Sequence, residues 1–297
     1  MSAPLIFALP GQESFARALS EHLDAPMGET TLRRFPDGET YVRVEEACKG
    51  RETIIVCSLD GPDRKVLPLF FLADTLHDLG AERVGLVAPY LAYMRQDVRF
   101  QPGEGITSRY FAKMASTHVD WLVTVDPHLH RYDSLDEIYG IDSRVVHAAE
   151  LVAAWIGAHI ERPLLIGPDV ESEQWVADVA GKAGAPSVVL EKVRRGDRDV
   201  EVSVPEVEQW REHTPVLFDD IISTGHTMIE TIRHLREAGM KPPVVVGVHG
   251  ILAEDAEKRL LEAGAERIVT TNTVAHETNQ IDLSGPVAAA VRSVLES

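Results

Sequence analysis

Short apolar runs alternate with longer stretches of helical periodicity along almost the whole chain. Residues 66–79, for example, carry leucines at intervals of three and four, which is typical of the buried face of a helix. Apolar runs that are too short for such a helix, and that turn residues bound, predict buried strands. These runs are 5–9, 53–57, 83–89, 121–125, 164–166, 187–190, 215–218, 244–248 and 267–271.

The alternation of strands and helices in both halves predicts an α/β protein with two similar doubly wound parallel-sheet domains. Residues 40–44 alternate in polarity and predict an antiparallel or edge strand. Helices are expected at 148–159 and 227–238. We place an N-terminal domain at 1–145 and a C-terminal domain at 146–297, and we expect the last helix to pack back on the first half.

Chain length and composition agree with two globular domains. The 297 residues suit two domains of roughly 150 residues each, and 44% hydrophobic residues suffice for two cores. Cys48 and Cys57 are the only cysteines, which argues against a disulfide framework and favours a reducing compartment. The longest apolar run, 66–73, is too short to cross a bilayer, and the N-terminus lacks a basic signal-peptide region. We therefore expect a cytoplasmic protein.

The net charge restricts the possible partners. The chain has 29 basic and 47 acidic residues, a formal charge of −18. Such an acidic surface argues against binding to nucleic acid or to an anionic membrane. Any site for an anionic substrate must therefore be built from a local cluster of basic groups.

Residues 216–227 carry the strongest chemical signal. A short apolar run predicts a buried strand that ends at Asp219 and Asp220, and a turn of small residues then leads into a helix. Backbone N–H groups and hydroxyls at a helix start can hold a phosphate, while the carboxylates would face ribose hydroxyls or a phosphate-bound magnesium ion. This arrangement predicts a site for a phosphorylated ribose. The alternative is that Asp and Ser or Thr side chains merely cap the helix.

Further segments match one family in order and spacing. They are Arg34-Phe35-Pro36-Asp37-Gly38-Glu39, Arg95-Gln96-Asp97, Asp126-Pro127-His128, Pro168-Asp169 and Lys192-Val193-Arg194-Arg195. With residues 219–227, they make the chain resemble the ribose-phosphate pyrophosphokinase (PRPP synthetase) family over nearly its whole length. The run 99–104 and the short chain are most similar to the compact archaeal-type members.

This resemblance implies a phosphoribosyltransferase-type fold and transfer of a pyrophosphoryl group from Mg-ATP to ribose 5-phosphate, giving PRPP and AMP. It implies that the N-terminal domain binds ATP through Phe35, Asp37, Gly38, Glu39, Arg95 and Gln96. The implied ribose 5-phosphate ligands are Arg194, Asp219, Asp220, Ser223, Thr224, Gly225, His226 and Thr227. Lys192 and Arg194 are the implied catalytic residues, and His128 and Asp169 the implied contacts of the cofactor Mg²⁺. The family also implies a homo-oligomer.

Each implied role has a physical rationale and an alternative. Phe35 offers a flat apolar face to a purine, and the alternative is a core residue beside a loop. Lys192 and Arg194 could neutralise charge on a transferring phosphoryl group, or could belong to a solvated polar loop at 194–199. His128 is an unusual magnesium contact, because this ion prefers oxygen ligands, and could be a structural histidine.

Two departures from the family pattern bear on regulation and substrate choice. Residues 170–173 read Val-Glu-Ser-Glu where the family usually has glycines. His226 stands where the family has a small residue, which would be unfavourable if that backbone required a positive φ. Two other functions stay open: a phosphoribosyltransferase that consumes PRPP, and a catalytically silent regulatory subunit associated with PRPP synthetase.

Overall fold

The chain folds into two compact units in a computed structural model that describes residues 3–168, 172–194, 200–203 and 207–297. Unit 1 comprises Met1–Val146, Thr273–Ala275 and Leu283–Ser297, and unit 2 comprises His147–Asn272 and His276–Asp282. Each unit has its own parallel sheet, so the α/β class predicted from the sequence is confirmed. Within the described ranges, no helix has the length and apolar character needed to cross a membrane.

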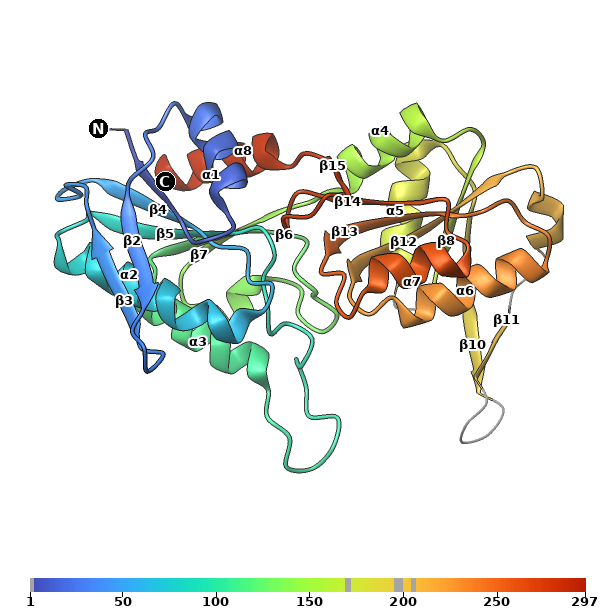
Figure 1. The fold of residues 1–297 in the computed structure, drawn as a ribbon, viewed down its shortest axis with the longest axis horizontal. Coiled ribbons are helices and arrows are strands. Elements are labelled where there is room, and N and C mark those ends of the chain that lie inside the picture. Colours follow the sequence, from blue (N-terminus) through green and yellow to red (C-terminus); the bar gives the residue numbers. More distant parts are fainter. Residues whose placement is uncertain (1–2, 169–171, 195–199, 204–206) are drawn as a thin grey trace. The chain divides into compact units, whose positions relative to one another are not determined.

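Unit 1 is built on five parallel strands in the order β1-β4-β5-β6-β7. Their bounds are β1 Leu5–Ala8, β4 Glu52–Val56, β5 Arg83–Ala88, β6 Trp121–Val125 and β7 Asp142–Val146. The helices are α1 Glu13–Leu23, α2 Val66–Asp78, α3 Thr107–His118 and α8 Ser284–Leu295, with short 3₁₀ turns η1 Pro62–Arg64 and η2 Leu135–Glu137. Helices α1 and α8 cover one face of this sheet, and α2 and α3 cover the other (Figure 1).

Helices on both faces explain why the strands of unit 1 are continuous apolar runs rather than alternating ones. Ile54 and Ile55 are adjacent in β4 and both are fully buried. The sheet is also tightly packed at Gly85 of β5, which pairs with Trp121 of β6. A Cβ atom at Gly85 would lie 2.0 Å from the indole ring, so only glycine fits there.

A two-stranded antiparallel ribbon, β2 Thr30–Arg34 and β3 Thr40–Val44, lies beside α2. The antiparallel strand predicted at 40–44 is confirmed. Leu32, Val42 and Val44 pack against the core of unit 1 and so define the inner face of the ribbon.

The last helix, α8, belongs to unit 1. It contacts α1, β6 and β7. The Arg292 guanidinium donates a hydrogen bond to the carbonyl oxygen of His22, and Arg83 Nη2 donates one to the carbonyl oxygen of Val294 at 3.4 Å. The chain therefore returns to its N-terminal unit after completing unit 2.

Unit 2 is built on six parallel strands in the order β15-β14-β13-β12-β8-β9. Their bounds are β8 Pro163–Gly167, β9 Ser187–Val189, β12 Thr214–Ile222, β13 Val244–Gly250, β14 Arg267–Thr271 and β15 Asn279–Ile281. The helices are α4 Ala149–His159, α5 Glu173–Ala183, α6 His226–Glu237 and α7 Ala256–Ala263, with the 3₁₀ turn η4 Val207–Trp210. An antiparallel pair, β10 Glu191–Arg194 and β11 Val200–Ser203, completes the unit.

Strand β12 is longer than the apolar run that predicted it. The acidic pair was expected after the strand, but β12 continues through both carboxylates, because β13 stays paired with it as far as Ile222 and Gly250. Backbone pairing in a central strand here overrides the low strand propensity of aspartate. Adjacent residues in a strand point to opposite faces, and Asp220 is buried while Asp219 is half-buried.

Candidate functional site

The tip of the β2–β3 ribbon brings four predicted ATP-binding residues together. The Phe35 amide donates to the carbonyl oxygen of Glu39 at 2.8 Å, and the Gly38 amide donates to that of Phe35 at 2.9 Å. The Glu39 amide also donates to Asp37 Oδ1 at 3.2 Å. Gly38 has a φ of 95°, a conformation that glycine adopts without steric cost.

Phe35 is an exposed aromatic platform, not a core residue. The residue is 39% exposed. The Arg33 guanidinium lies 4.7 Å from the centre of this ring and 4.2 Å from that of Tyr41, and the two rings meet edge-on at 5.9 Å. These contacts hold the Phe35 ring at the surface of the ribbon. An aromatic ring in such a position can stack on a planar base.

The loops after β5 and β6 are tied together by a buried carboxylate. Asp97 is 5% exposed, and its two carboxylate oxygens accept from Arg131 Nη1 at 2.9 and 3.1 Å. The Tyr132 hydroxyl donates to the carbonyl oxygen of Asp97 at 3.1 Å, and Arg109 Nε donates to that hydroxyl at 3.1 Å. These contacts fix the segment that follows Arg95 and Gln96, of which Arg95 is exposed and Gln96 is half-buried.

The loop after β6 begins with an unusual backbone conformation. Asp126 is buried and has a φ of 30°, and its amide donates to the carbonyl oxygen of Val146 at 3.0 Å. Positive φ values in non-glycine residues concentrate at functional sites, where the surrounding structure holds the strain. The half-buried His128 follows, with its ring centre 4.0 Å from that of the exposed His130.

The two predicted metal contacts are His128 and Asp169. His128 lies in unit 1, whereas Asp169 lies outside the described residues. Within the described ranges, no group of three or more His, Cys, Asp and Glu side chains could hold a metal ion. Magnesium bound to substrate phosphates commonly takes only one or two protein ligands and keeps several waters.

In unit 2 the predicted phosphate loop connects β12 to α6. Gly225 carries the positive φ of this loop, 67°. A Cβ atom added at this position would lie 3.3 Å from the Leu260 side chain. His226 is instead the first residue of α6, so it does not occupy a left-handed position. The concern about its backbone therefore does not apply. The loop is anchored by the Ala253 amide, which donates to the carbonyl oxygen of Ser223 at 3.1 Å.

The first turn of α6 has the features of an anion site. Its N-cap is Gly225, which has no side chain to cap the helix, and the first turn contains no acidic residue. The dipole and free N–H groups of such a helix end favour a bound phosphate. Ser223, Thr224 and Thr227 are half-buried beside this end, while the exposed His226 ring has its Nε2 3.2 Å from Glu230 Oε1.

Lys192 and Arg194 lie on strand β10, in register with Val202 and Val200 of β11. The sequence predicted a polar loop at 194–199, but Arg194 is the last residue of a strand, and 195–199 lie outside the described residues. Pairing with β11 explains the difference, because it keeps the polar residue Arg194 within strand β10.

Sequence reasoning missed the residues that hold these loops. Arg109, Arg131 and Tyr132 lie outside the quoted motifs, and they contact Asp97 or one another across gaps of 23 to 35 positions. No local pattern marks such pairs. Asp97 belongs to the segment Arg95-Gln96-Asp97, but the sequence analysis assigned it no role.

Comparison with known proteins places these observations in a family. Residues 4–118 match the family model of the N-terminal domain of ribose phosphate pyrophosphokinase, and residues 134–283 match that of the phosphoribosyl transferase domain. The chain is 34% identical to a ribose-phosphate pyrophosphokinase of Methanopyrus kandleri, over 98% of this chain and 99% of the relative. It is 33% identical to one of Saccharolobus solfataricus, over 86% and 88%. The crystal structure of phosphoribosylpyrophosphate synthetase from Mycobacterium smegmatis superposes with a TM-score of 0.87 at 26% identity and covers 99% of both chains.

Proposed function

The chain belongs to the ribose-phosphate pyrophosphokinase family, and we propose that it makes PRPP and AMP from ATP and ribose 5-phosphate. The observation that carries this proposal is the match of both halves, over nearly the full length, to pyrophosphokinase relatives. A phosphoribosyltransferase that consumes PRPP would not need the N-terminal half, so the match at residues 4–118 does not favour that alternative.

In this proposal unit 1 binds ATP. The exposed ring of Phe35 stacks on the adenine, and Asp37 and Glu39 accept hydrogen bonds from its amino group. Arg95 and Gln96 contact the remainder of the nucleotide. The support is physical: the Phe35 ring is exposed and held by Arg33, and the Arg95–Gln96 segment is anchored through Asp97.

Unit 2 binds ribose 5-phosphate in the same proposal. The loop Ser223 to Thr227 holds the 5-phosphate at the uncapped start of α6. We assign the acidic pair Asp219 and Asp220 to the ribose hydroxyls, because carboxylates repel a phosphate but accept hydrogen bonds from hydroxyl groups. The half-buried Asp219 is the more accessible of the two. The half-buried hydroxyls of Ser223, Thr224 and Thr227 support this arrangement.

The proposed chemistry is an in-line displacement at the β-phosphorus of ATP. The anomeric oxygen O1 of the sugar forms a bond to this phosphorus and loses its proton to water, and the bond to the oxygen bridging the α-phosphorus breaks, so that AMP leaves. No covalent enzyme intermediate is needed, so positioning and charge stabilisation supply most of the rate. We assign the charge stabilisation to Lys192 and Arg194, and Arg194 also contacts ribose 5-phosphate.

Magnesium is the proposed cofactor. When bound, it neutralises the phosphate oxygens and supports the in-line geometry. His128 and Asp169 are the residues that we propose to contact it. Asp169 has the oxygen ligands that this ion prefers, whereas His128 is an unusual contact, and an ion held mainly by substrate phosphates needs few protein ligands.

We propose that the protein assembles as a homo-oligomer. Helices α2 and α3 carry exposed large apolar side chains: Leu67, Phe71, Tyr110 and Met114 are 45–55% exposed. Clusters of exposed apolar side chains often mark interaction surfaces. A cytoplasmic location stays a prediction.

The test is a product analysis with and without the sugar. Mg-ATP alone is expected to give little hydrolysis, whereas addition of ribose 5-phosphate gives AMP and PRPP in equal amounts. ADP as the sugar-dependent product would place the attack at the γ-phosphorus and refute the proposal. Absence of any sugar-dependent turnover would favour the silent regulatory subunit.

A further inference from the structure

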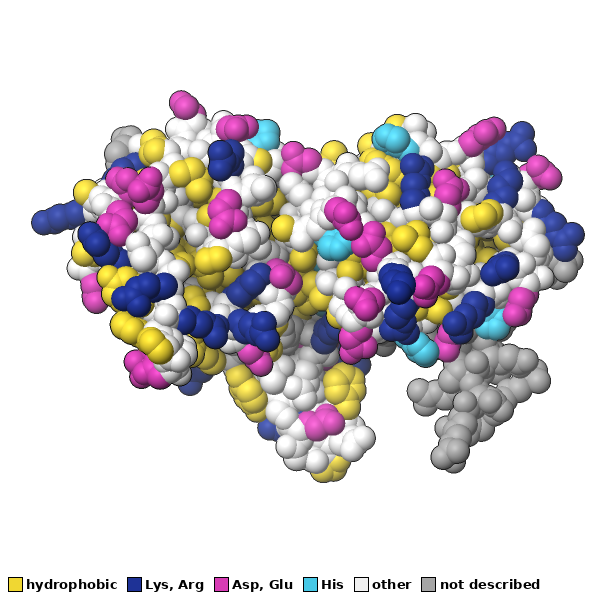
Figure 2. Space-filling view, in the orientation of Figure 1, with side chains coloured by type: hydrophobic (Ala, Val, Ile, Leu, Met, Phe, Trp, Pro, Cys, Tyr) yellow, Lys and Arg dark blue, Asp and Glu magenta, His cyan; other side chains and the backbone are white. Residues whose placement is uncertain are grey.

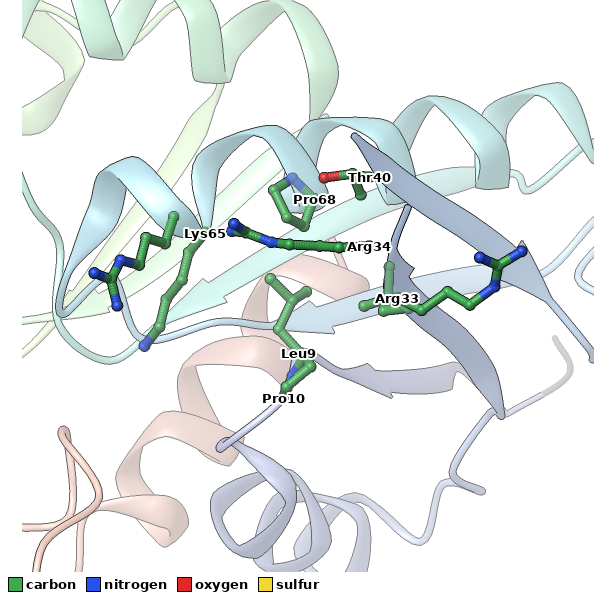
Figure 3. Close-up of a pocket in the computed structure, with 9 residues that line it drawn as sticks. Leu9, Pro10, Arg33, Arg34, Thr40, Lys65 and Pro68 are labelled. Atoms are coloured by element: carbon green, nitrogen blue, oxygen red, sulfur yellow. The ribbon is translucent and has the colours of Figure 1, made fainter. Parts of the chain in front are cut away.

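The two faces of the β2–β3 ribbon carry different chemistry. Arg33 and Phe35 lie on the outer face with Tyr41, where their side chains contact one another. Arg34, one residue on from Arg33, lies on the inner face, because side chains alternate along a strand. Figure 3 shows the Arg34 side chain reaching toward Lys65 and Pro68, whereas Arg33 turns away. The inner face is therefore separate from the proposed adenine platform.

A cavity of about 220 Å³ opens on this inner face. Its lining comes from the end of β1, from the ribbon, and from the start of α2: Leu9, Pro10, Leu32, Arg33, Arg34, Thr40, Arg64, Lys65 and Pro68. The lining residues include four cationic residues and no carboxylate, and three of the four, Arg34, Arg64 and Lys65, are not directed to the outer face as Arg33 is. This composition is notable in a chain with a formal charge of −18. Figure 2 shows Lys and Arg side chains over α2 and the neighbouring ribbon.

Two of the four cations already have partners inside unit 1. Lys65 Nζ donates to Asp60 Oδ1 at 2.6 Å and to the carbonyl oxygen of Ser58 at 2.9 Å. The Arg33 guanidinium lies over the aromatic rings. The guanidinium groups of Arg34 and Arg64 have no ion pair or hydrogen bond with the described part of the chain. Two guanidinium groups without such partners at one cavity favour an anionic ligand there.

The remaining lining favours a ligand with an anionic end and an apolar body. Helix α2 begins at this cavity without a side-chain cap and without an acidic residue in its first turn, which adds to the attraction for an anion. Leu9, Leu32 and the two prolines form the apolar part of the wall. Guanidinium groups bind phosphate through paired hydrogen bonds, because their planar set of N–H donors matches two phosphate oxygens.

We infer that this cavity is a second ligand site, which binds a phosphate monoester with its phosphate on Arg34 and Arg64 and its apolar body on Leu9 and Leu32. This inference is independent of the proposed function, because it concerns neither the adenine platform nor the phosphate loop of unit 2.

Calorimetric titration of the full-length protein with phenyl phosphate tests the inference. Ribose 5-phosphate and a non-hydrolysable ATP analogue are present throughout, so that the proposed substrate sites are filled. We expect saturable binding of one phenyl phosphate per chain. Arg34→Gln and Arg64→Gln should each raise its Kd by about tenfold or more, the value of one charge-assisted hydrogen bond.

Arg43→Gln is the matched control. Arg43 lies on the same ribbon and pairs with Glu45, but it does not line the cavity. The Arg43→Gln protein should therefore bind phenyl phosphate with the Kd of the wild type. Circular dichroism and thermal unfolding confirm that each variant is folded. Inorganic phosphate should bind more weakly than phenyl phosphate, because it cannot contact the apolar wall, and equal affinity would refute the ester as the ligand class. No binding with the substrate sites filled, or unchanged affinity in folded Arg34→Gln and Arg64→Gln proteins, would overturn the inference.

Discussion

Arg131 neutralises the buried carboxylate of Asp97, with Nη1 at 2.9 and 3.1 Å from its two oxygens, across 34 positions of sequence. The Asp97 side chain is 2% exposed, whereas that of Arg131 is 49% exposed. This pair joins the loop that follows β5 to the loop that follows β6. The loops carry Arg95 and His128, two residues with proposed roles in ATP and magnesium binding.

Replacement of Arg131 by glutamine should therefore affect both stability and ATP binding. It leaves a buried carboxylate without its charged partner, which costs about 1–3 kcal/mol in the free energy of unfolding. We expect the KM for ATP to rise several-fold, while that for ribose 5-phosphate stays unchanged. Arg144→Gln, which removes an exposed pair with Asp142, serves as the control. Loss of stability without any change in the KM for ATP would show that the pair has only a structural role.

Replacement of Lys192 by alanine tests the proposed catalytic charge. If Lys192 acts mainly in the transition state, kcat should fall by about two orders of magnitude or more with a modest change in KM. Lys182→Ala, which removes an exposed lysine paired with Asp178 on α5, should leave the kinetics unchanged. A loss confined to KM would move Lys192 to ground-state binding, and normal kinetics would remove it from the site.

The phosphate loop of unit 2 should discriminate between the two substrates. Asp219→Asn and Thr227→Ala each remove one proposed contact to ribose 5-phosphate, so the Kd for this substrate should rise by about tenfold. The Kd for ATP should change little. Calorimetric titrations with each substrate separate the two effects. Equal weakening of both substrates would indicate a general folding defect.

The buried thiol of Cys57 predicts loss of stability at alkaline pH. Burial raises the pKa of Cys57 from 9.0 to about 12. The unfolded chain therefore loses this proton at a lower pH than the folded chain, and the stability present below pH 9.0 declines as the pH rises toward about 12. Between about pH 8 and about pH 10, the raised pKa of Cys57 should lower the free energy of unfolding by about 1.4 kcal/mol.

Denaturant unfolding of the wild type and of Cys57→Ala at these two pH values measures this contribution. The alanine variant starts less stable, because it loses a buried sulfur atom, but it should show the smaller decline between the two pH values. Parallel declines would contradict the assignment to Cys57.

Much of the fold could be predicted because buried parallel strands are continuous apolar runs. Strand β6 has the bounds 121–125 that its apolar run predicts. Strands with few apolar residues escaped prediction, because their positions depend on pairing with distant segments. Strand β2 has one apolar residue, Leu32, and edge strand β7 begins with three polar ones. The end of β12 was likewise set by β13 and not by its own sequence.

The candidate site was predicted where a motif is local. The turn around Gly38 and the loop before α6 each lie within a few residues, and the structure brings the members of each together. Gly225, rather than His226, takes the positive φ of this loop, as the conformational freedom of glycine favours. Contacts such as Asp97 with Arg131 leave no local pattern at all.

The fate of the two terminal phosphates of ATP tests the central claim most directly. Phosphorus NMR of the product formed from Mg-ATP and ribose 5-phosphate should show two mutually coupled phosphorus atoms attached at C1 of the sugar, with the 5-phosphate unchanged and AMP in equal amount. A single new phosphorus on the sugar together with ADP, or free phosphate without a new sugar ester, would contradict pyrophosphoryl transfer.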